Sequence, residues 1–387
     1  MRIGLIVRGG VEEGTEAHNP FPVFVDFIRR LATNDDVQVF SLQGESRASL
    51  VSLVGSAPPP HRFAGASVHA LGTTRAPRLR VAADVTRVLA AIRSSRPRGE
   101  RPEILHGIGQ APGFIATVIG RLLRVPSVVS LIGGELTSLP AAGYGELRTA
   151  RGRAMMRLQL RWTDALTAAS RFMHARVASH GGQAHLLPFG VDVEKFQFPV
   201  GRPGGPPFRL LHVGNLYPVK DQLTLVRAVR RLVDDGCDVS LDIVGWDDWN
   251  GTVQRETAQL GLAERVTFHG WRSRDELVPL YRGAHALVMT SVDDVAPVVV
   301  LEAAASGLPV AGTDVGFIAD WAPDRAVATP IGDPAALAGA LRALLADRGR
   351  REALAARAQA WVGAHASLAA DDAYLDLYRA LLRSRRW

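Results

Sequence analysis

The sequence predicts an α/β protein made of two doubly wound parallel-sheet domains that face each other across a cleft. Short β-branched runs alternate with longer amphipathic stretches along the chain, as they do in repeated βα units. This alternation is interrupted by a Pro/Gly-rich stretch at residues 199–207 and then restarts. The chain has 387 residues, 47% of them hydrophobic, which is enough for two domains with substantial buried cores.

The elements follow from this alternation in chain order. In the first half, apolar runs predict strands at 3–7, 37–42, 67–71, 104–106, 127–132 and 165–168. Amphipathic stretches between them predict helices at 23–31, 78–92, 114–123 and 146–162. The second half restarts with predicted strands at 209–213, 240–244, 266–269, 286–289, 309–312 and 326–329. Residues 334–383 read as helical, with a break near Gly363.

These patterns predict four segments. We expect a first domain at 1–198 and a linker at 199–208, because its prolines and glycines can neither continue a helix nor pair in a central sheet. A second domain is expected at 209–366. The last segment, 367–387, is expected to be a helix long enough to cross back onto the first domain.

Charge and cysteine content narrow the possible partners. The net charge is +7, its basic excess lies in the first half, and every cationic residue except Lys195 and Lys220 is arginine. No basic-aromatic RNA motif accompanies this bias, so no nucleic-acid partner is expected. The single cysteine, Cys237, excludes an internal disulfide and a thiolate-rich metal site, and we expect no bound metal.

The hydropathy pattern predicts a cytoplasmic protein. No apolar run reaches the roughly 18 residues that a membrane-spanning helix needs, and the opening apolar run is too short for a secretory signal. Segment 147–162 is a basic amphipathic helix. We read its arginine face as solvated, and peripheral contact with the inner face of an anionic membrane is the less favoured alternative. The arginines of this segment are Arg148, Arg151, Arg153, Arg157 and Arg161.

Small and polar residues follow the predicted strands in both halves. In open parallel sheets, ligands bind beyond the carboxyl ends of the strands, where strand order reverses. The positions concerned are Gly9-Gly10, Gly107 and Gly133-Gly134 in the first half, and Gly214-Asn215, Gly245 and 291–294 in the second. Each turn alone is unspecific, but together they predict a ligand-binding cleft between the domains.

The second half carries a more specific constellation. Asn215, which follows Gly214, precedes Lys220 by five positions, and Gly245 and Gly270 follow later strands. Seven residues separate Asp294 from Glu302. Glu302 opens the run Glu302-Ala303-Ala304-Ala305-Ser306-Gly307-Leu308-Pro309-Val310. In this order and spacing, the residues resemble the donor domain of retaining glycosyltransferases of family four (glycosyl transferases group 1). The resemblance extends into the first half through Ile104-Leu105-His106-Gly107 and Leu187-Pro188-Phe189-Gly190-Val191-Asp192.

The resemblance implies a fold, a reaction and partners. The fold would be GT-B, two Rossmann-like domains facing each other. A hexose-type sugar would pass from a nucleotide diphosphate sugar, with UDP favoured and GDP possible, to a hydroxyl of a glycan, glycolipid or secondary metabolite. The anomeric configuration would be retained, and neither a metal nor a cofactor would be needed.

The implied catalytic residues are Lys220, Asp294 and Glu135. A departing diphosphate gains negative charge, so the site needs a fixed cation, such as Lys220, where that charge develops. The family usually has arginine where this chain has Asn215, which can donate hydrogen bonds but carries no charge. Asp294 stands at the position of a glutamate that contacts the donor sugar. Glu135 follows the turn Gly133-Gly134 and could contact a hydroxyl, although an ordinary helix-start acid is an alternative.

The implied donor-binding residues surround these three. Glu302 occupies the position that binds ribose hydroxyls, and its apolar setting would make an unpartnered carboxylate costly. Trp271 could flank the base or simply pack over its turn. The complete expected set is Gly10, Gly133, Gly134, Gly214, Asn215, Lys220, Gly245, Trp271, Val298, Val299 and Glu302. His106 could approach the acceptor, but a histidine at a strand end is more often structural.

Two other classes remain open. A dinucleotide-dependent oxidoreductase shares the βα alternation, but the first turn lacks the G-x-G-x-x-G pattern that lets a pyrophosphate approach. A catalytically silent nucleotide-sugar-binding relative is suggested by departures from the family pattern. These departures are Ile132 in place of a histidine, Asn215, Asp294 and Pro297.

Overall fold

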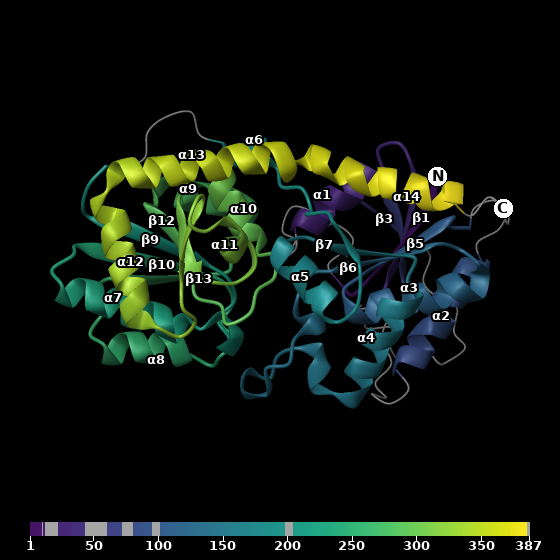
Figure 1. Ribbon diagram of the computed structural model, residues 1–387, viewed down its shortest axis with the longest axis horizontal. Helices are drawn as coiled ribbons and strands as arrows, with labels where there is room; N and C mark the ends of the chain where they lie inside the picture. Colours follow the sequence, from purple (N-terminus) through teal and green to yellow (C-terminus); the bar gives the residue numbers. More distant parts are fainter. Residues whose placement is uncertain are drawn as a thin grey trace.

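The computed structural model describes residues 1–9, 11, 22–42, 60–71, 80–94, 101–197 and 204–384, and it places two α/β domains side by side (Figure 1). In these ranges the first sheet has eight strands in the order β3-β4-β2-β1-β5-β6-β7-β8, and the second has six in the order β11-β10-β9-β12-β13-β14. Neighbouring strands pair in parallel, except β3 with β4. The predicted fold class is therefore confirmed.

The first domain alternates strands and helices as the sequence predicts. Its strands are β1 (Arg2–Val7), β2 (Asp36–Ser41), β3 (His61–Phe63), β4 (Ala66–Ala70), β5 (Ile104–Ile108), β6 (Ser127–Leu131), β7 (Ala165–Ala168) and β8 (Ala184–Leu186). Its helices are α1 (Pro22–Leu31), α2 (Arg80–Ser94), α3 (Gln110–Leu123), α4 (Ala150–Trp162), α5 (Arg171–Ser179) and the short α6 (Val193–Phe196). Of the predicted linker, residues 199–203 lie outside the described residues.

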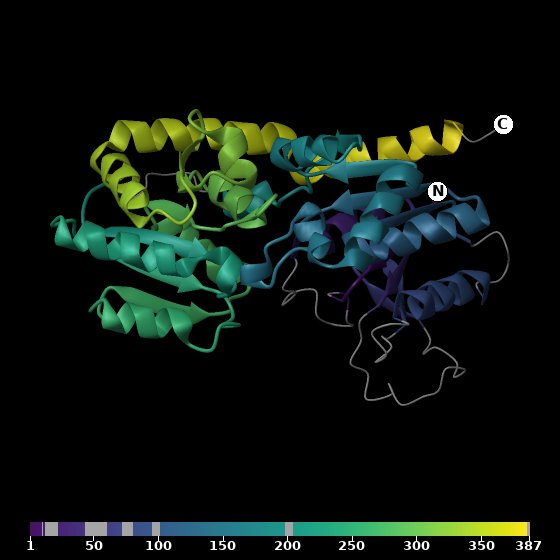
Figure 2. The same ribbon diagram turned by 60° about the horizontal axis from the view of Figure 1, so that its bottom comes forward.

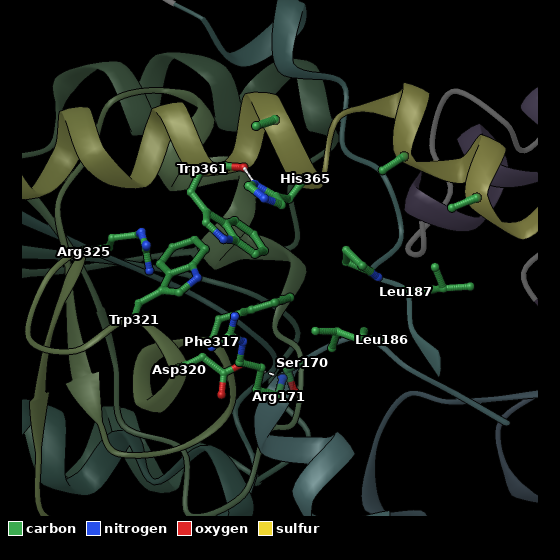
Figure 3. A pocket seen from close by; sticks show the side chains of 15 residues that line it. Ser170, Arg171, Leu186, Leu187, Phe317, Asp320, Trp321, Arg325, Trp361 and His365 are labelled. Atoms are coloured by element: carbon green, nitrogen blue, oxygen red, sulfur yellow. Dashed lines mark hydrogen bonds between the residues drawn. The ribbon is translucent and has the colours of Figure 1, made fainter. Parts of the chain in front are cut away.

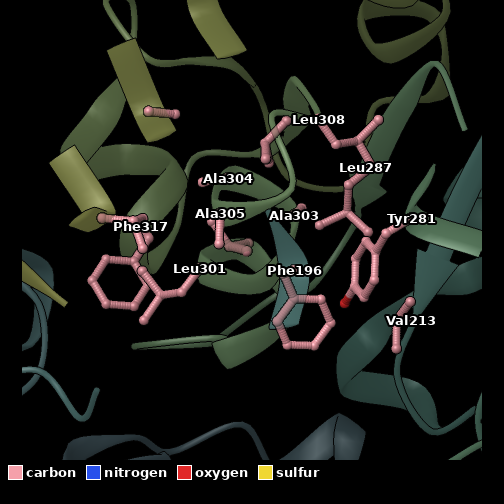
Figure 4. Close-up of a cluster of buried hydrophobic side chains, with 14 of the residues drawn as sticks. Phe196, Val213, Tyr281, Leu287, Leu301, Ala303, Ala304, Ala305, Leu308 and Phe317 are labelled. Atoms are coloured by element: carbon pink, nitrogen blue, oxygen red, sulfur yellow. The ribbon is translucent and has the colours of Figure 1, made fainter. Parts of the chain in front are cut away.

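The second domain repeats the pattern. Its strands are β9 (Phe208–Val213), β10 (Val239–Val244), β11 (Val266–Gly270), β12 (Ala286–Met289), β13 (Val310–Thr313) and β14 (Ala326–Thr329). Its helices are α7 (Gln222–Asp234), α8 (Thr252–Gln259), α9 (Arg274–Gly283), α10 (Val298–Ala305), α11 (Gly316–Trp321), α12 (Pro334–Ala346) and α13 (Arg348–His365). Helix α10 buries Leu301 and its alanines in the core beside β12 (Figure 4).

Two predicted helical segments are divided differently in the structure. The expected helix 146–162 is divided, because Thr149 adopts an extended backbone and its hydroxyl caps α4 by accepting from the Gly152 N–H at 2.9 Å. The expected helical region 334–383 also breaks at Asp347, whose carboxylate caps α13. Its second break follows α13 at residue 366, three positions beyond the expected Gly363.

The end of the chain runs across both domains. Helix α13 lies on the second domain, and after a 3₁₀ turn (Leu368–Asp371) helix α14 (Asp372–Ser384) lies along the first, in Figure 1 and again in the turned view of Figure 2. Tyr374 and Tyr378 of α14 are buried in the core that contains Phe27 and Phe189. The apolar face of α14 therefore completes the core of the first domain.

The two segments in which the chain crosses between the domains lie side by side. The Val191 N–H donates to the Ala366 carbonyl at 2.7 Å, and the Gly190 N–H donates to the Asp371 carboxylate at 2.9 Å. A Cβ on Gly190 would lie 2.5 Å from the Ser367 carbonyl oxygen, so only glycine allows this approach. The two interdomain passages are thus joined by one backbone–backbone hydrogen bond and one hydrogen bond from backbone to side chain.

His106 belongs to this structural core. Hydrogen bonds join its Nδ1 to the Tyr378 hydroxyl at 2.6 Å and its Nε2 to the Ser130 hydroxyl at 2.8 Å. Burial lowers the pKa of His106 to about 3, so the ring is neutral at physiological pH. These contacts assign His106 to the attachment of α14 and not to an acceptor site.

Replacing Tyr378 with phenylalanine is expected to lower the free energy of unfolding by about 1–3 kcal/mol, because a buried histidine nitrogen loses its partner. Chemical denaturation at neutral pH measures this change. Arg379→Ala, on the exposed side of the same helix, is the control. A Tyr378→Phe protein as stable as the wild type would show that the His106 contact contributes nothing.

Candidate active site

The carboxyl edge of the second sheet brings Lys220 and Asp294 together. Lys220 ends a 3₁₀ turn (Pro218–Lys220) after β9, and Asp294 lies in the loop after β12. The Lys220 ammonium forms an ion pair with the Asp294 carboxylate, and the two side chains are 18% and 15% exposed. The Thr290 hydroxyl donates to the Lys220 carbonyl at 2.9 Å, which fixes the two loops to each other.

The ion pair keeps Lys220 charged despite its burial. Burial lowers the pKa of Lys220, but the Asp294 carboxylate and Tyr217 outweigh this effect, and the resulting pKa is above its ordinary value. A permanent, partly desolvated cation therefore stands at the sheet edge. Such a cation interacts strongly with an anion that reaches it, because the local dielectric is low.

Glu302 lies one turn inside α10 and is almost fully buried. Its Oε2 accepts a hydrogen bond from the Tyr281 hydroxyl at 2.9 Å, and its Oε1 lies 3.9 Å from Nε of Arg274. Burial raises the pKa of Glu302, while Arg274 and the Tyr281 hydroxyl lower it. The apolar surroundings expected from the sequence are present, and the carboxylate has a cation beside it.

The turns at Gly214 and Gly245 provide space for close backbone packing. The Gly214 N–H donates to Val244 and the Gly245 N–H donates to Gly270, so both amides serve the sheet. Gly245 has a φ of +148°, and a Cβ there would lie 2.2 Å from the Gly214 carbonyl oxygen. Only glycine fits at Gly245. A Cβ added at Gly214 would lie 3.9 Å from Cε of Lys220, so Gly214 lies next to the Lys220 side chain.

Asn215 is held by the neighbouring loop. Its Nδ2 donates to the Asp248 carboxylate at 3.3 Å, and its Oδ1 accepts from the Trp246 N–H at 3.2 Å. The amide is thus engaged where the family pattern places a charged arginine. In this arrangement Lys220 is the cation that the second domain presents beside Asp294.

Two tryptophans lie where β10 and β11 end. The rings of Trp246 and Trp271 stack with centroids 5.5 Å apart and planes 13° from parallel. Trp246 is 46% exposed, so the stack has an open aromatic face. The sequence left two roles open for Trp271, flanking the base or packing over its turn, and the structure shows its ring stacked on that of Trp246.

The first domain contributes Glu135 and its turn. Glu135 is buried, and its carboxylate accepts the Gly133 N–H at 2.7 Å and the Ile132 N–H at 3.2 Å. The Gly133 amide is therefore engaged by Glu135. Burial raises the pKa of Glu135, and these backbone donors oppose the rise. Gly134 packs against Tyr144, whose ring would lie 2.9 Å from an added Cβ.

Tyr144 of the first domain lies near charged groups of both domains and was not predicted. Burial raises the pKa of its hydroxyl, and the nearby charges of Asp294, Asp293 and Glu135 contribute to the rise. Tyr144 thus lies within electrostatic reach of both predicted catalytic carboxylates. A tyrosine in a glycine-rich loop carries no sequence pattern that would have identified it.

Direct contacts hold the two domains together beside this site. The Asp293 carboxylate accepts from the Thr137 hydroxyl at 2.7 Å and pairs with Arg176 at 2.8 Å. The Ser170 hydroxyl donates to the Val295 carbonyl at 2.5 Å. The loop that carries Asp294 is therefore fastened to the first domain on both sides.

The remaining predicted donor-binding residues can be placed as follows. Val298 and Val299 open α10, where N–H groups of the first helical turn have no acceptor within the helix. Val298 packs against the cores of both domains. Gly10 lies outside the described residues. Within the described ranges, no cluster of three or more His, Cys, Asp or Glu side chains could hold a metal ion.

A cavity of about 390 Å³ lies between the domains, away from Lys220 and Glu302. Figure 3 shows Phe317, Trp321 and Trp361 on one side of it and Leu186 and Leu187 on the other. Asp320 at its edge accepts the backbone N–H groups of Arg171 and Phe172 at 2.6 and 2.8 Å. This cavity is not the predicted donor site.

The predicted basic helix has its apolar side inside the protein. Met155 and Met156 of α4 are buried, whereas Arg153, Arg157 and Arg161 are exposed, so the helix presents arginines to solvent. Trp162 at its end is partly exposed. In the described part of the chain, no helix combines the length and apolarity that a membrane crossing requires.

Each half of the chain matches a glycosyltransferase family. Residues 192–361 match the family described as Glycosyl transferases group 1, and residues 23–192 match the Glycosyl transferase 4-like domain. A D-inositol 3-phosphate glycosyltransferase of Nocardia farcinica is 33% identical over 44% of this chain and 40% of its own length. A GDP-mannose-dependent alpha-(1-6)-phosphatidylinositol monomannoside mannosyltransferase of Mycobacterium tuberculosis is 30% identical over 52% of this chain and 58% of its own length. The chain thus matches about half the length of these relatives.

Solved structures match the whole fold. Anabaena HepE superposes with a TM-score of 0.74 at 17% sequence identity, over 99% of this chain and 100% of that chain. Sucrose-phosphate synthase from Thermosynechococcus elongatus superposes with a TM-score of 0.75 at 18% identity, over 99% of this chain and 100% of that chain. The chain thus carries a Glycosyl transferase 4-like domain at residues 23–192 and a Glycosyl transferases group 1 domain at residues 192–361. Its overall architecture is the two-domain GT-B fold.

Proposed function

We propose that this protein transfers a sugar from a nucleoside diphosphate sugar to an acceptor hydroxyl, with retention of the anomeric configuration. The observation that carries the proposal is the Lys220–Asp294 ion pair at the sheet edge, beside the contact of Asp293 with Thr137 of the first domain. A UDP-sugar is the favoured donor, because HepE has been solved with UDP-glucose. A GDP-sugar is the second possibility, since the mycobacterial relative is GDP-mannose-dependent.

The proposed donor pose uses groups of the second domain. The Lys220 ammonium contacts the diphosphate, Glu302 accepts hydrogen bonds from ribose hydroxyls, and the Trp246–Trp271 stack borders the base. The N–H groups that open α10, at Val298 and Val299, face the same anion with the favourable end of the helix dipole. Each assignment pairs an anionic, hydroxyl-bearing or aromatic part of the ligand with a matching protein group.

The proposed reaction balances without an added metal. The bond between the anomeric carbon and the diphosphate oxygen breaks, and the acceptor oxygen bonds to that carbon from the same face. The acceptor proton passes to a diphosphate oxygen, which leaves a nucleoside diphosphate and a glycoside. Lys220 stabilises the charge that grows on the leaving group, and Asp294 orients the ammonium and the sugar hydroxyls.

The acceptor is proposed only as a hydroxyl compound, on a glycan, glycolipid or secondary metabolite. The relatives named above act on an inositol phosphate and on a phosphatidylinositol mannoside, respectively. We also propose a cytoplasmic location, where nucleotide sugars are available. Contact with a membrane surface through 147–162 is not part of the proposal, because the apolar side of α4 is buried.

Thermal stabilisation by a panel of UDP, GDP, ADP and TDP sugars tests donor binding on the full chain. A donor at 100 times its Kd should add about 2.7 kcal/mol to the free energy of unfolding. Nucleotide release with and without EDTA, followed by NMR of the product's anomeric proton, then tests transfer, metal independence and retention. Stabilisation by no nucleotide would refute the proposal, and binding without transfer to any acceptor would favour the silent relative.

A further inference from the structure

Arg274 is a buried cation that the proposed reaction does not yet use. It is the first residue of α9, next to the Ser273–Glu276 capping box that fixes the start of the helix. Its side chain is only 11% exposed, and its guanidinium lies 5.9 Å from the centre of the Phe196 ring. A guanidinium this deep in a protein is costly unless its charge and its donors are matched.

Its charge is matched by two carboxylates from different domains. Nη1 of Arg274 donates to Oδ2 of Asp26 at 2.6 Å, and Asp26 belongs to α1 of the first domain. On the other side, Nε lies 3.9 Å from Oε1 of Glu302. Arg274 therefore stands between the first domain and the carboxylate proposed to hold the ribose.

Its hydrogen-bonding capacity is not matched. Nε and Nη2 are buried and have no hydrogen-bond partner in the described part of the chain. The Glu302 Oε2 atom accepts from Tyr281, but in the same described ranges its Oε1 accepts no hydrogen bond. The distance of 3.9 Å is too long for a hydrogen bond between Nε and Oε1. Two donors of Arg274 and one acceptor of Glu302 thus lie near each other without a hydrogen bond between them.

A ribose hydroxyl that reaches both residues has the chemistry to satisfy these groups. It carries one O–H donor and two lone pairs, so it can donate to Oε1 of Glu302 and accept from the guanidinium of Arg274 at once. Resting on the proposed function, we propose that Arg274 is a second ribose-binding residue of the donor site, held in place across the domain interface by Asp26. The donor site is then complete only when α1 of the first domain contacts α9.

The assignment differs from a purely structural role in one measurable respect. A structural arginine would affect every nucleotide equally, whereas a ribose contact distinguishes nucleotides that have the hydroxyls from those that lack one. The probes are UDP and GDP with their 2′-deoxy and 3′-deoxy forms, and the Kd of each is measured by calorimetry on the full chain. The wild type should bind the ribonucleotide more tightly than at least one deoxy form.

Arg274→Met is expected to weaken binding of the ribonucleotide that the wild type prefers by about 10- to 100-fold. Binding of the deoxy form that the wild type binds less tightly should weaken much less. The preference for the hydroxyl should therefore collapse. Asp26→Asn, which keeps Arg274 but loosens it, should reduce the same preference by a smaller factor. Arg272→Met is the matched control, because Arg272 lies two residues away, is more exposed, and contacts only Glu276 and its own chain neighbour in the described ranges.

The outcomes separate this inference from the proposed function. If wild type binds a ribonucleotide but Arg274→Met and Asp26→Asn keep the full preference for the hydroxyl, the inference is wrong and the proposed function stands. If wild type binds none of the nucleotides, the proposed function fails and this inference fails with it. Thermal unfolding of each variant is measured alongside, and Asp26→Asn decides the matter if Arg274→Met does not fold.

Discussion

Replacing Lys220 with alanine should lower turnover about 10²- to 10³-fold, which corresponds to about 2.7–4 kcal/mol of lost transition-state stabilisation. The reason is that Lys220 is the cation paired with Asp294, while Asn215 is engaged by Asp248 and carries no charge. Nucleotide release at saturating donor measures the effect. Because the diphosphate gains charge mainly in the transition state, kcat should fall more than the KM for donor rises.

The chain offers a matched control for this experiment. Its other lysine, Lys195, pairs with Asp275, whose side chain is 79% exposed. Lys195→Ala should leave turnover within a factor of two. Lys220→Ala must also be checked for folding, since it removes the cation beside a largely buried Asp294. A folded Lys220→Ala protein with wild-type turnover would contradict the role of Lys220 at the diphosphate.

Replacing Asp371 with asparagine should raise the free energy of unfolding at neutral and higher pH. Asp371 is fully buried, one of its carboxylate oxygens has no hydrogen-bond partner in the described ranges, and burial raises its pKa to about 7. Between pH 4 and 7 the unfolded chain loses this proton while the folded chain keeps it. The free energy of unfolding therefore falls as pH rises through this window, by up to about 4 kcal/mol, and the loss is complete above pH 7.

Asparagine removes this titration and still offers an oxygen to the Gly190 N–H. The stability difference between Asp371→Asn and wild type should grow from pH 4 to 7 and level off above. Chemical denaturation at several pH values measures it, with the exposed Asp376→Asn as the control. A difference that does not change with pH would show that Asp371 is ionised throughout this range.

Much of the fold could be predicted because its central strands are continuous apolar runs. Strands buried on both faces, such as β1 and β9, need such runs, and the helices between them show a clear apolar side. The strands β3 and β8 were not predicted. Each has three residues at an edge of the sheet, where one-sided pairing leaves no strong apolar pattern.

The candidate site was predictable where its residues lie close in the sequence. The spacing of Asp294 and Glu302 was visible because one loop and one helix carry both residues. Arg274 was missed because its meaning depends on Asp26, which lies 248 positions away in the other domain. Sequence spacing cannot show such a pair, since the contact depends on how the two domains dock. The same holds for Tyr144, because the Asp294 charge that raises the pKa of its hydroxyl comes from the other domain.

The crossing helix α14 has a consequence for how this protein is made. Domains generally fold as units during synthesis, with the first one leading. Here the core around Phe27 and Phe189 needs Tyr374 and Tyr378, which the ribosome adds only after the whole second domain has been translated. The first domain must therefore wait, with part of its apolar surface uncovered, until α14 has followed the second domain out of the ribosome.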